Sequence, residues 1–170
     1  VYVRLFQALP KGDKLDSIIQ KAVECGASEI IPFQSDRCVV RIKDASEDRK
    51  NERRRRIATE AAKQCRRSLV PEVSAAVSFD NAIDLAAKSD LCLFCYEGEG
   101  TRPLGEILRS CDTLPRSVSI IIGSEGGFSE AEAEAAKAKG AVMTGLGKRI
   151  LRTETASGFV LACLVMISEL

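Results

Sequence analysis

The sequence contains neither histidine nor tryptophan, and only 5% of its 170 residues are aromatic. Without histidine, one chain cannot perform Ser-His-Asp or Cys-His catalysis. A catalytic zinc or non-haem iron site is also disfavoured, because both rely on imidazole ligands, and we expect no metal. None of the few aromatic residues falls in the basic segment 49–67, which argues against a protein that reads single-stranded nucleic acid by base stacking.

Long apolar segments are absent as well. The longest stretch without a charged residue, 155–168, is shorter than the roughly 20 apolar residues of a membrane-spanning helix. We therefore expect a soluble, cytoplasmic protein with no membrane partner. An organelle is the alternative, because the chain starts at Val1 and a targeting segment would be missing together with the native N-terminus.

The seven cysteines are an odd number and stand singly in apolar segments of a chain that is long enough to fold without disulfides. This usage favours a reducing compartment. Cys92 and Cys95 form a CxxC motif, but the apolar run 91–95 around them is typical of a strand, whereas redox CxxC pairs usually open a helix. We interpret both as buried core residues, with a redox or metal role as the alternative.

The net charge of +1 conceals a strong asymmetry. Segment 49–67 has nine basic and two acidic residues (+7), so the remaining 16 basic and 22 acidic residues carry −6. The pattern predicts a helix over 46–68 with an apolar arc and cations on the opposite side, although Arg54 falls on the apolar side. A solvated helix face is the alternative, but the shortage of acids to pair the arginines favours phosphate binding. The candidate RNA-binding residues are Arg37, Arg53, Arg56, Lys63, Arg66 and Arg67.

Strand and helix patterns alternate along the chain. Strands are expected at 1–9, 28–33, 91–95, 117–122 and 141–146, with short ones near 38–41 and 72–77. Helices are expected from Asp13 to Gly26, over 46–68 and 81–88, from Pro103, from Ser129 to Gly140, and from Thr153 or Thr155 to Leu170. This order predicts one α/β domain with a mainly parallel sheet and helices on both faces.

The final helix is apolar nearly all round, so it needs cover on every side, in a core or at a subunit interface. Ligands in open α/β sheets bind at the carboxyl ends of strands, which draws attention to the loops after Cys95, Ile122 and Leu146. Loop 123–129 has three glycines but matches neither a GxGxxG fingerprint nor a GK[ST] ending. By itself it is equally compatible with a tight turn and with a ligand loop.

Segments 122–129 (IGSEGGFS) and 146–156 (LGKRILRTETA) resemble the signature pair of the ribosomal RNA uracil-N3 methyltransferases, which belong to the SPOUT class. The resemblance extends through segments 14–16, 20–21, 29–33, 35–37, 60–65 and 70–72 and covers essentially the whole chain. The family usually has proline where this chain has Ser124.

The resemblance implies a fold with a C-terminal trefoil knot, S-adenosylmethionine as cofactor, and methylation of N3 of a specific uridine in small-subunit (16S-type) ribosomal RNA. It also implies a homodimer formed through the knot region and helix 155–170. The family's N-terminal RNA-binding barrel of PUA type would end just before this chain starts. The alternatives are a SPOUT enzyme acting on a transfer RNA base or a ribose 2′-hydroxyl, and a non-catalytic RNA-binding module.

Site residues follow from the same resemblance. Without histidine, the base that removes the uracil N3 proton must be a carboxylate, a lysine or solvent. We expect Arg152 to stabilise the uracil anion and Glu125 or Glu154 to handle the proton, unless both glutamates merely bind backbone amides at helix starts. The cofactor-binding candidates are Phe94, Glu97, Gly123, Ser124, Glu125, Gly126, Gly127, Leu146, Gly147, Ile150, Leu151, Thr155 and Ala156.

Overall fold

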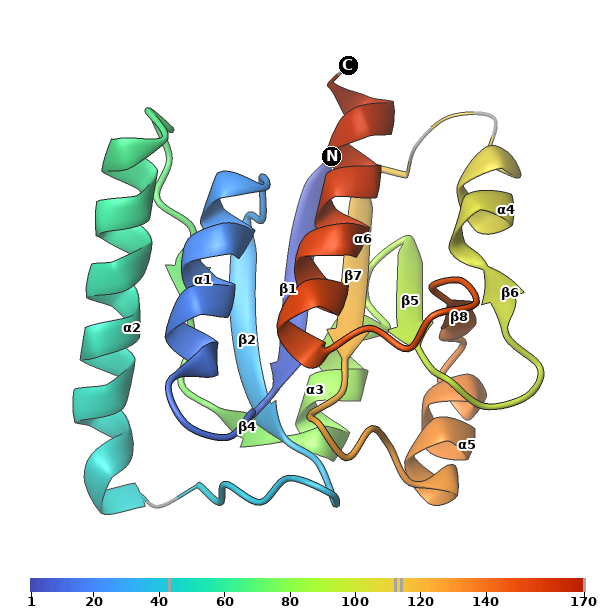
Figure 1. Cartoon of the computed structure of the whole chain (residues 1–170), viewed down its shortest axis with the longest axis horizontal. Coiled ribbons are helices and arrows are strands. Elements are labelled where there is room, and N and C mark those ends of the chain that lie inside the picture. Colours follow the sequence, from blue (N-terminus) through green and yellow to red (C-terminus); the bar gives the residue numbers. More distant parts are fainter. Residues whose placement is uncertain (43, 112, 114, 170) are drawn as a thin grey trace.

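The computed structural model describes residues 1–42, 44–111, 113 and 115–169. Its strands are β1 (Tyr2–Ala8), β2 (Glu29–Gln34), β3 (Glu72–Val73), β4 (Val77–Ser78), β5 (Leu91–Cys95), β6 (Arg102–Pro103), β7 (Ser117–Ile122) and β8 (Val142–Gly145). They form one sheet in the order β3-β2-β1-β7-β5-β8-β6, with β4 paired to β2, and these pairs are parallel. The predicted parallel α/β architecture is confirmed (Figure 1).

Helices cover both faces of this sheet. They are α1 (Lys14–Glu24), α2 (Asp44–Gln64), α3 (Phe79–Ala86), α4 (Leu104–Arg109), α5 (Glu130–Ala138) and α6 (Thr153–Ser168). In Figure 1, α2, α1 and α6 stand in a row in front of the sheet. Gln7 of β1 contacts Thr153 of α6 on that face, and Phe33 of β2 meets Phe79 of α3 on the other.

The core follows from the hydrophobic pattern of the central strands. Almost every residue of β1 and β7 is buried, as expected for strands covered on both faces. In α1, the predicted apolar residues are all buried: Leu15, Ile18, Ile19, Ala22 and Val23. The CxxC motif lies in β5, where Cys92 is buried and burial raises its pKa to about 12. Its thiol therefore stays protonated at neutral pH.

Helix caps were predicted with mixed success. The capping box of α5 is present, because Ser129 Oγ accepts from the Glu132 amide and the Glu132 carboxylate accepts from the Ser129 amide. Asp13 occupies the cap position of α1, but its side chain makes no capping hydrogen bond within the residues that the structure describes. The prediction of a threonine cap for α6 is wrong: Arg152 holds that position, and the Thr153 hydroxyl donates to the carbonyl oxygen of Gly123 instead.

The expected strand at 38–41 is also wrong. Cys38 is buried beside Ser35, whose amide donates to Cys38 Sγ. The amide of Ile42 donates to Gln34 Oε1 rather than to a neighbouring strand. Segment 38–41 thus forms a bend, and the amides on either side of it are satisfied by side chains.

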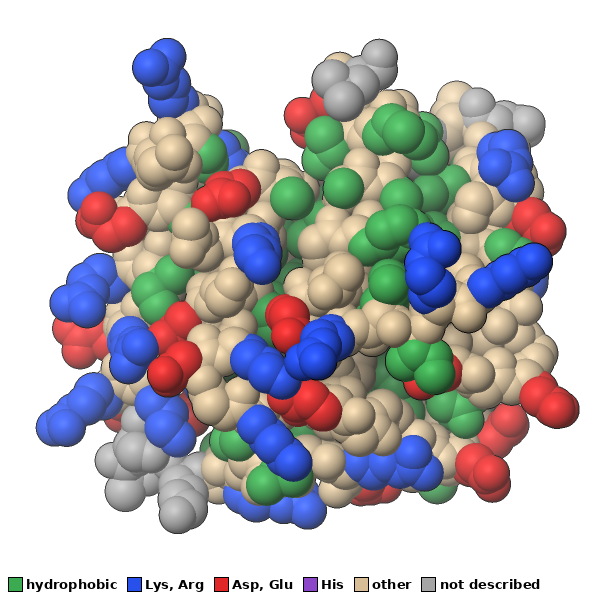
Figure 2. Space-filling view, viewed as in Figure 1, with side chains coloured by type: hydrophobic (Ala, Val, Ile, Leu, Met, Phe, Trp, Pro, Cys, Tyr) green, Lys and Arg blue, Asp and Glu red, His purple; other side chains and the backbone are tan. Residues whose placement is uncertain are grey.

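Helix α6 is apolar nearly all round, but its two sides have different surroundings. Ala156, Val160, Leu161 and Leu164 are buried in the chain's own core, whereas Phe159, Met166 and Ile167 are exposed (41%, 60% and 43%). Figure 2 shows hydrophobic side chains at the surface around this helix. Leu170, the predicted end of the helix, lies outside the described residues. No helix in the described part of the chain combines the length and apolar character needed to cross a bilayer.

Candidate functional site

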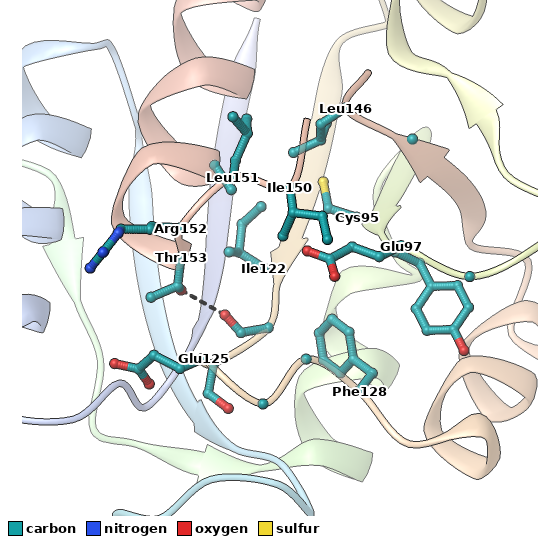
Figure 3. Close-up of a pocket in the computed structure, with 18 of the residues that line it drawn as sticks. Cys95, Glu97, Ile122, Glu125, Phe128, Leu146, Ile150, Leu151, Arg152 and Thr153 are labelled. Atoms are coloured by element: carbon teal, nitrogen blue, oxygen red, sulfur yellow. Dashed lines mark hydrogen bonds between the residues drawn. The ribbon is translucent and has the colours of Figure 1, made fainter. Parts of the chain in front are cut away.

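The loops that follow β5, β7 and β8 meet at the carboxyl edge of the sheet and enclose a cavity of about 750 Å³. Figure 3 shows side chains from all three loops around it. Glu97, Ile122, Phe128 and Ile150 surround one part of the cavity, while Arg152 and Glu125 point to the other side. The expected site is therefore one continuous cavity, built from segments far apart in the sequence.

Glycines shape the loop after β7. A Cβ at Gly123 would lie 3.1 Å from the Phe128 ring, and one at Gly126 would lie 3.0 Å from Arg37 Cβ and 3.2 Å from Arg37 O. Gly127 has φ +65°, in the left-handed region that side chains with a Cβ rarely adopt. Gly123 and Gly126 are thus required because neighbouring atoms leave little room for a Cβ, and Gly127 is required because of its positive φ.

Eleven of the thirteen cofactor-binding candidates line the cavity: Glu97, Gly123, Ser124, Glu125, Gly126, Gly127, Leu146, Gly147, Ile150, Leu151 and Ala156. The other two do not. Phe94 is fully buried, and its ring centroid lies 4.2 Å from that of Phe128. It therefore packs behind a residue of the lining and is not itself part of the lining. Thr155 is exposed on the first turn of α6 and lies outside the lining.

The three catalytic candidates also line the cavity, together with Lys14, a residue that the sequence pattern did not single out. Lys14 Nζ lies 2.7 Å from Glu125 Oε1 and 4.0 Å from Glu154 Oε2. The backbone amide of Lys11 also donates to Glu125, so this glutamate does bind an amide just before a helix. Lys14 belongs to segment 14–16, which resembles the family, and this resemblance was the signal in the sequence that could have assigned it to the site.

The two glutamates differ in their surroundings. Burial alone would raise the pKa of Glu125, but hydrogen bonds from Lys14 and from backbone amides outweigh this effect and hold the pKa below its ordinary value. Glu125 is therefore ionised and already paired at neutral pH. Glu154 Oε2, by contrast, is buried and has no hydrogen-bond partner among the described residues.

The cations of α2 have more partners than their sequence suggested. Arg54 is buried and pairs with Glu47, and Arg53 pairs with Asp16 of α1 at 2.6 Å. Arg67 donates to the carbonyl oxygens of Val23 and Ala27, which anchors the end of the basic segment to the end of α1. Residues outside segment 49–67, namely Glu47, Asp16 and the carbonyls at the end of α1, thus supply partners for three of its arginines, which the shortage of acids within the segment did not indicate.

The remaining RNA-binding candidates are exposed. Lys63 pairs with Glu60, a surface contact of little energetic weight. Arg56 and Arg66 form no ion pair within the described residues. Arg37 lies on the cavity rim, where its guanidinium donates to Gly126 O. Figure 2 shows Lys and Arg with interspersed Asp and Glu along the edge formed by α2.

Comparison with known proteins agrees with this geometry. The model of a family described as an RNA methyltransferase domain matches residues 1–165. The chain belongs to this family. Among curated RNA methyltransferases, Ribosomal RNA small subunit methyltransferase E of Bacillus subtilis is 41% identical over 175 aligned residues, which span 100% of this chain and 68% of that protein. The protein of the same name from Synechocystis is 36% identical, and the alignment spans 94% of this chain and 52% of that one.

Solved methyltransferase structures show the same fold. A putative methyltransferase from Legionella pneumophila, in complex with bound S-adenosylmethionine, superposes with a TM-score of 0.89 at 32% identity. Ribosomal RNA small subunit methyltransferase E from Neisseria gonorrhoeae, bound to the same molecule, gives 0.87 at 30%. Both comparisons cover 98% of this chain and 66% of the other. This chain thus spans about two thirds of these relatives.

Proposed function

We propose that the protein is an S-adenosylmethionine-dependent methyltransferase that methylates N3 of a specific uridine in small-subunit ribosomal RNA. The observation that carries the proposal is the cavity, since residues of both segments that resemble the signature pair of the uracil-N3 methyltransferases, 122–129 and 146–156, line it. The proposal includes the trefoil knot of the SPOUT class. The Thr153–Gly123 hydrogen bond joins the loops after β7 and β8, and this contact supports the proposed knot.

The cavity suits the cofactor. Glycines let a ligand approach the backbone closely, and apolar side chains such as Ile122 and Leu151 can cover an adenosine. Ser124 Oγ is buried and has no partner among the described residues, so a polar atom is left for a ligand. When bound, S-adenosylmethionine would supply an electrophilic methyl group on its sulfonium. The protein's own contribution is to position the uracil and to handle its N3 proton.

Roles for the polar side chains follow from their partners. The Arg152 guanidinium, on the Glu125 side of the cavity, suits stabilisation of the uracil anion (Figure 3). Glu154 is the better proton acceptor, because its Oε2 has no hydrogen-bond partner among the described residues, whereas Glu125 is held by Lys14 and Lys11. Lys14 would then fix Glu125 and balance the charge of the two carboxylates.

The proposal is tested by methyl transfer. The purified protein is incubated with S-adenosylmethionine labelled in its methyl group and with small ribosomal subunits that lack the modification. We expect label in the small-subunit RNA. Large subunits and transfer RNA serve as controls, and label in transfer RNA would support the rival SPOUT activity. Binding of RNA without any cofactor binding or transfer would support a non-catalytic RNA-binding module.

Exposed cations of α2 and of the turn after it provide a test of RNA binding. Replacing Arg56 and Arg66 by glutamate should weaken RNA binding and lower the slope of log affinity against log salt by about one for each phosphate that the protein no longer neutralises. Affinity for S-adenosylmethionine should not change, because neither residue lines the cavity. Filter binding at several salt concentrations measures the slope. An unaltered slope would mean that this helix face is merely solvated.

We also propose that the protein is a homodimer through α6 and the neighbouring knot region. The supporting observation is the exposed apolar side of α6, with Phe159, Met166 and Ile167, together with Ile150 at the cavity, which is 81% exposed. Leu164 of the same helix is buried in its own subunit, so a substitution there would disturb the core and would not test the interface.

The dimer prediction is tested with Phe159→Glu. A charge at this exposed apolar position should shift the protein to a monomer in analytical ultracentrifugation, because it would be buried without a partner in the dimer. Leu69→Glu is the matched control, since Leu69 is exposed (76%) but lies beyond α2. A wild-type monomer at micromolar concentration with full activity would contradict the prediction.

A further inference from the structure

A buried polar junction joins three segments beneath the cavity. Gln7, near the end of β1, is fully buried, and Thr153, the first residue of α6, is 6% exposed. The third member is the carbonyl group of Gly123, the first residue after β7, which accepts from the Thr153 hydroxyl. The dashed line at Thr153 in Figure 3 marks this hydrogen bond. The three segments are far apart in the sequence, so the junction is a tertiary feature of the site.

The hydrogen bonds of the junction form a chain that runs from Gln7 through Thr153 to the carbonyl oxygen of Gly123. Thr153 Oγ1 donates to Gly123 O at 2.6 Å, and Gln7 Nε2 donates to Thr153 Oγ1 at 2.9 Å and to Ala8 O at 3.0 Å. Gln7 Nε2 is also 3.4 Å from Gly123 O, a long contact. The glutamine thus orients the threonine hydroxyl, and the hydroxyl holds the glycine carbonyl.

Two details argue that this junction is more than packing. Gln7 Oε1 is buried without a partner among the described residues, which costs stability that an apolar side chain at this position would retain. The Thr153 hydroxyl, which is also buried, donates to a backbone carbonyl of the cavity lining and not to solvent. The junction therefore costs stability at Gln7 while it holds the Gly123 carbonyl.

The direction of that carbonyl determines the geometry of the loop. A trans peptide unit is planar, and the described residues contain no cis bond, so fixing Gly123 O also fixes the amide N–H of Ser124 in the opposite direction, away from α6. Gly123 and Ser124 both line the cavity. The same bond fixes the first turn of α6, where Arg152 and Glu154 flank Thr153.

We propose that Gln7 and Thr153 are positioning residues that set the Gly123–Ser124 peptide for cofactor binding. This inference rests on the proposed function, because it takes S-adenosylmethionine as the ligand of the cavity. Neither side chain needs to touch the cofactor: Gln7 acts through Thr153, and Thr153 acts through the backbone of the loop.

The test compares variants that keep shape but remove hydrogen bonds. Thr153→Val and Gln7→Leu should each weaken binding of S-adenosylmethionine about tenfold, as expected for about 1.4 kcal/mol of lost preorganisation. Thr153→Ser retains the hydroxyl and should restore most of the affinity. Because both residues act on one carbonyl, the double variant should lose less than the sum of the two singles. Affinities come from calorimetry, and melting temperatures are recorded in parallel.

Ser119→Ala is the matched control. Ser119 is fully buried in β7, the strand that leads to Gly123, and its hydroxyl bonds to Ser89 at 2.8 Å. Its removal should lower the melting temperature without changing cofactor affinity, which is the behaviour of a merely structural hydrogen bond. If Thr153→Val does not fold, the smaller Thr153→Ala takes its place.

The outcomes separate the two proposals. A wild-type protein that does not bind S-adenosylmethionine overturns the proposed function. Wild-type binding that is equally tight in folded Thr153→Val or Thr153→Ala overturns the positioning role and leaves the function intact. A similar affinity loss in Ser119→Ala would also overturn it, because general destabilisation would then explain the effect.

Discussion

Removing the charge at Arg152 or Glu154 is expected to abolish most of the methyl transfer while leaving the cofactor bound. Arg152→Ala should lower kcat about 100-fold, the effect of deleting one group that stabilises a developing anion. Glu154→Gln should lower it by a similar factor of about 100, because an amide cannot accept the uracil N3 proton. Single-turnover transfer to small-subunit RNA measures the rates, and calorimetry checks that cofactor affinity is unchanged.

Glu125→Gln is the matched control for this prediction. Glu125 lines the same cavity but is paired to Lys14 Nζ at 2.7 Å, so we expect it to support structure rather than chemistry. Its substitution should change the rate much less than Glu154→Gln does. If Glu125→Gln were the slower enzyme, the proton would belong to Glu125. If neither substitution changed the rate, solvent would be the acceptor.

Placing a β-branched side chain at Gly127 should remove cofactor binding. Gly127 has φ +65°, which costs about 1–2 kcal/mol for a residue with a Cβ and more for a β-branched one. The loop can relieve this strain by changing its conformation. We therefore expect Gly127→Val to weaken binding of S-adenosylmethionine by about tenfold or more, as measured by calorimetry.

Gly140→Val is the control that distinguishes a loss of affinity caused by backbone strain alone from one caused by a change in the cavity. Gly140 follows α5 with φ +85°, and a Cβ there would meet no heavy atom of the described residues within 4 Å, as at Gly127. It does not line the cavity. The two variants should lose similar stability, but only Gly127→Val should lose affinity. Equal affinity in both folded variants would mean that loop 123–129 is a tight turn without a ligand role.

Much of the fold was predictable because local chemistry and tertiary structure agree. The apolar runs 91–95 and 117–122 are strands with those same bounds, and Ser129 with Glu132 caps α5 as expected. The cavity also followed from sequence, since parallel strands bring the loops at their carboxyl ends together. Most of the residues predicted to line the cavity came from segments 122–129 and 146–156, through the family resemblance.

What escaped prediction depends on contacts between distant residues. The basic segment did not reveal that Arg53 pairs with Asp16, or that Arg67 binds the carbonyls at the end of α1. The threonine cap failed because a buried carbonyl oxygen, Gly123 O, accepts the Thr153 hydroxyl. For Lys14, the family resemblance of segment 14–16 was the one signal in the sequence, because nothing in the pattern of its own helix indicates that it faces Glu125.

The most direct test of the function is the chemical identity of the product. Small-subunit RNA methylated by the purified protein is digested to nucleosides and analysed by mass spectrometry against synthetic standards. The account predicts a single new product, N3-methyluridine, formed only with S-adenosylmethionine and formed about 100-fold more slowly with Arg152→Ala. Methyl label on a ribose 2′-hydroxyl or on another base would contradict the account.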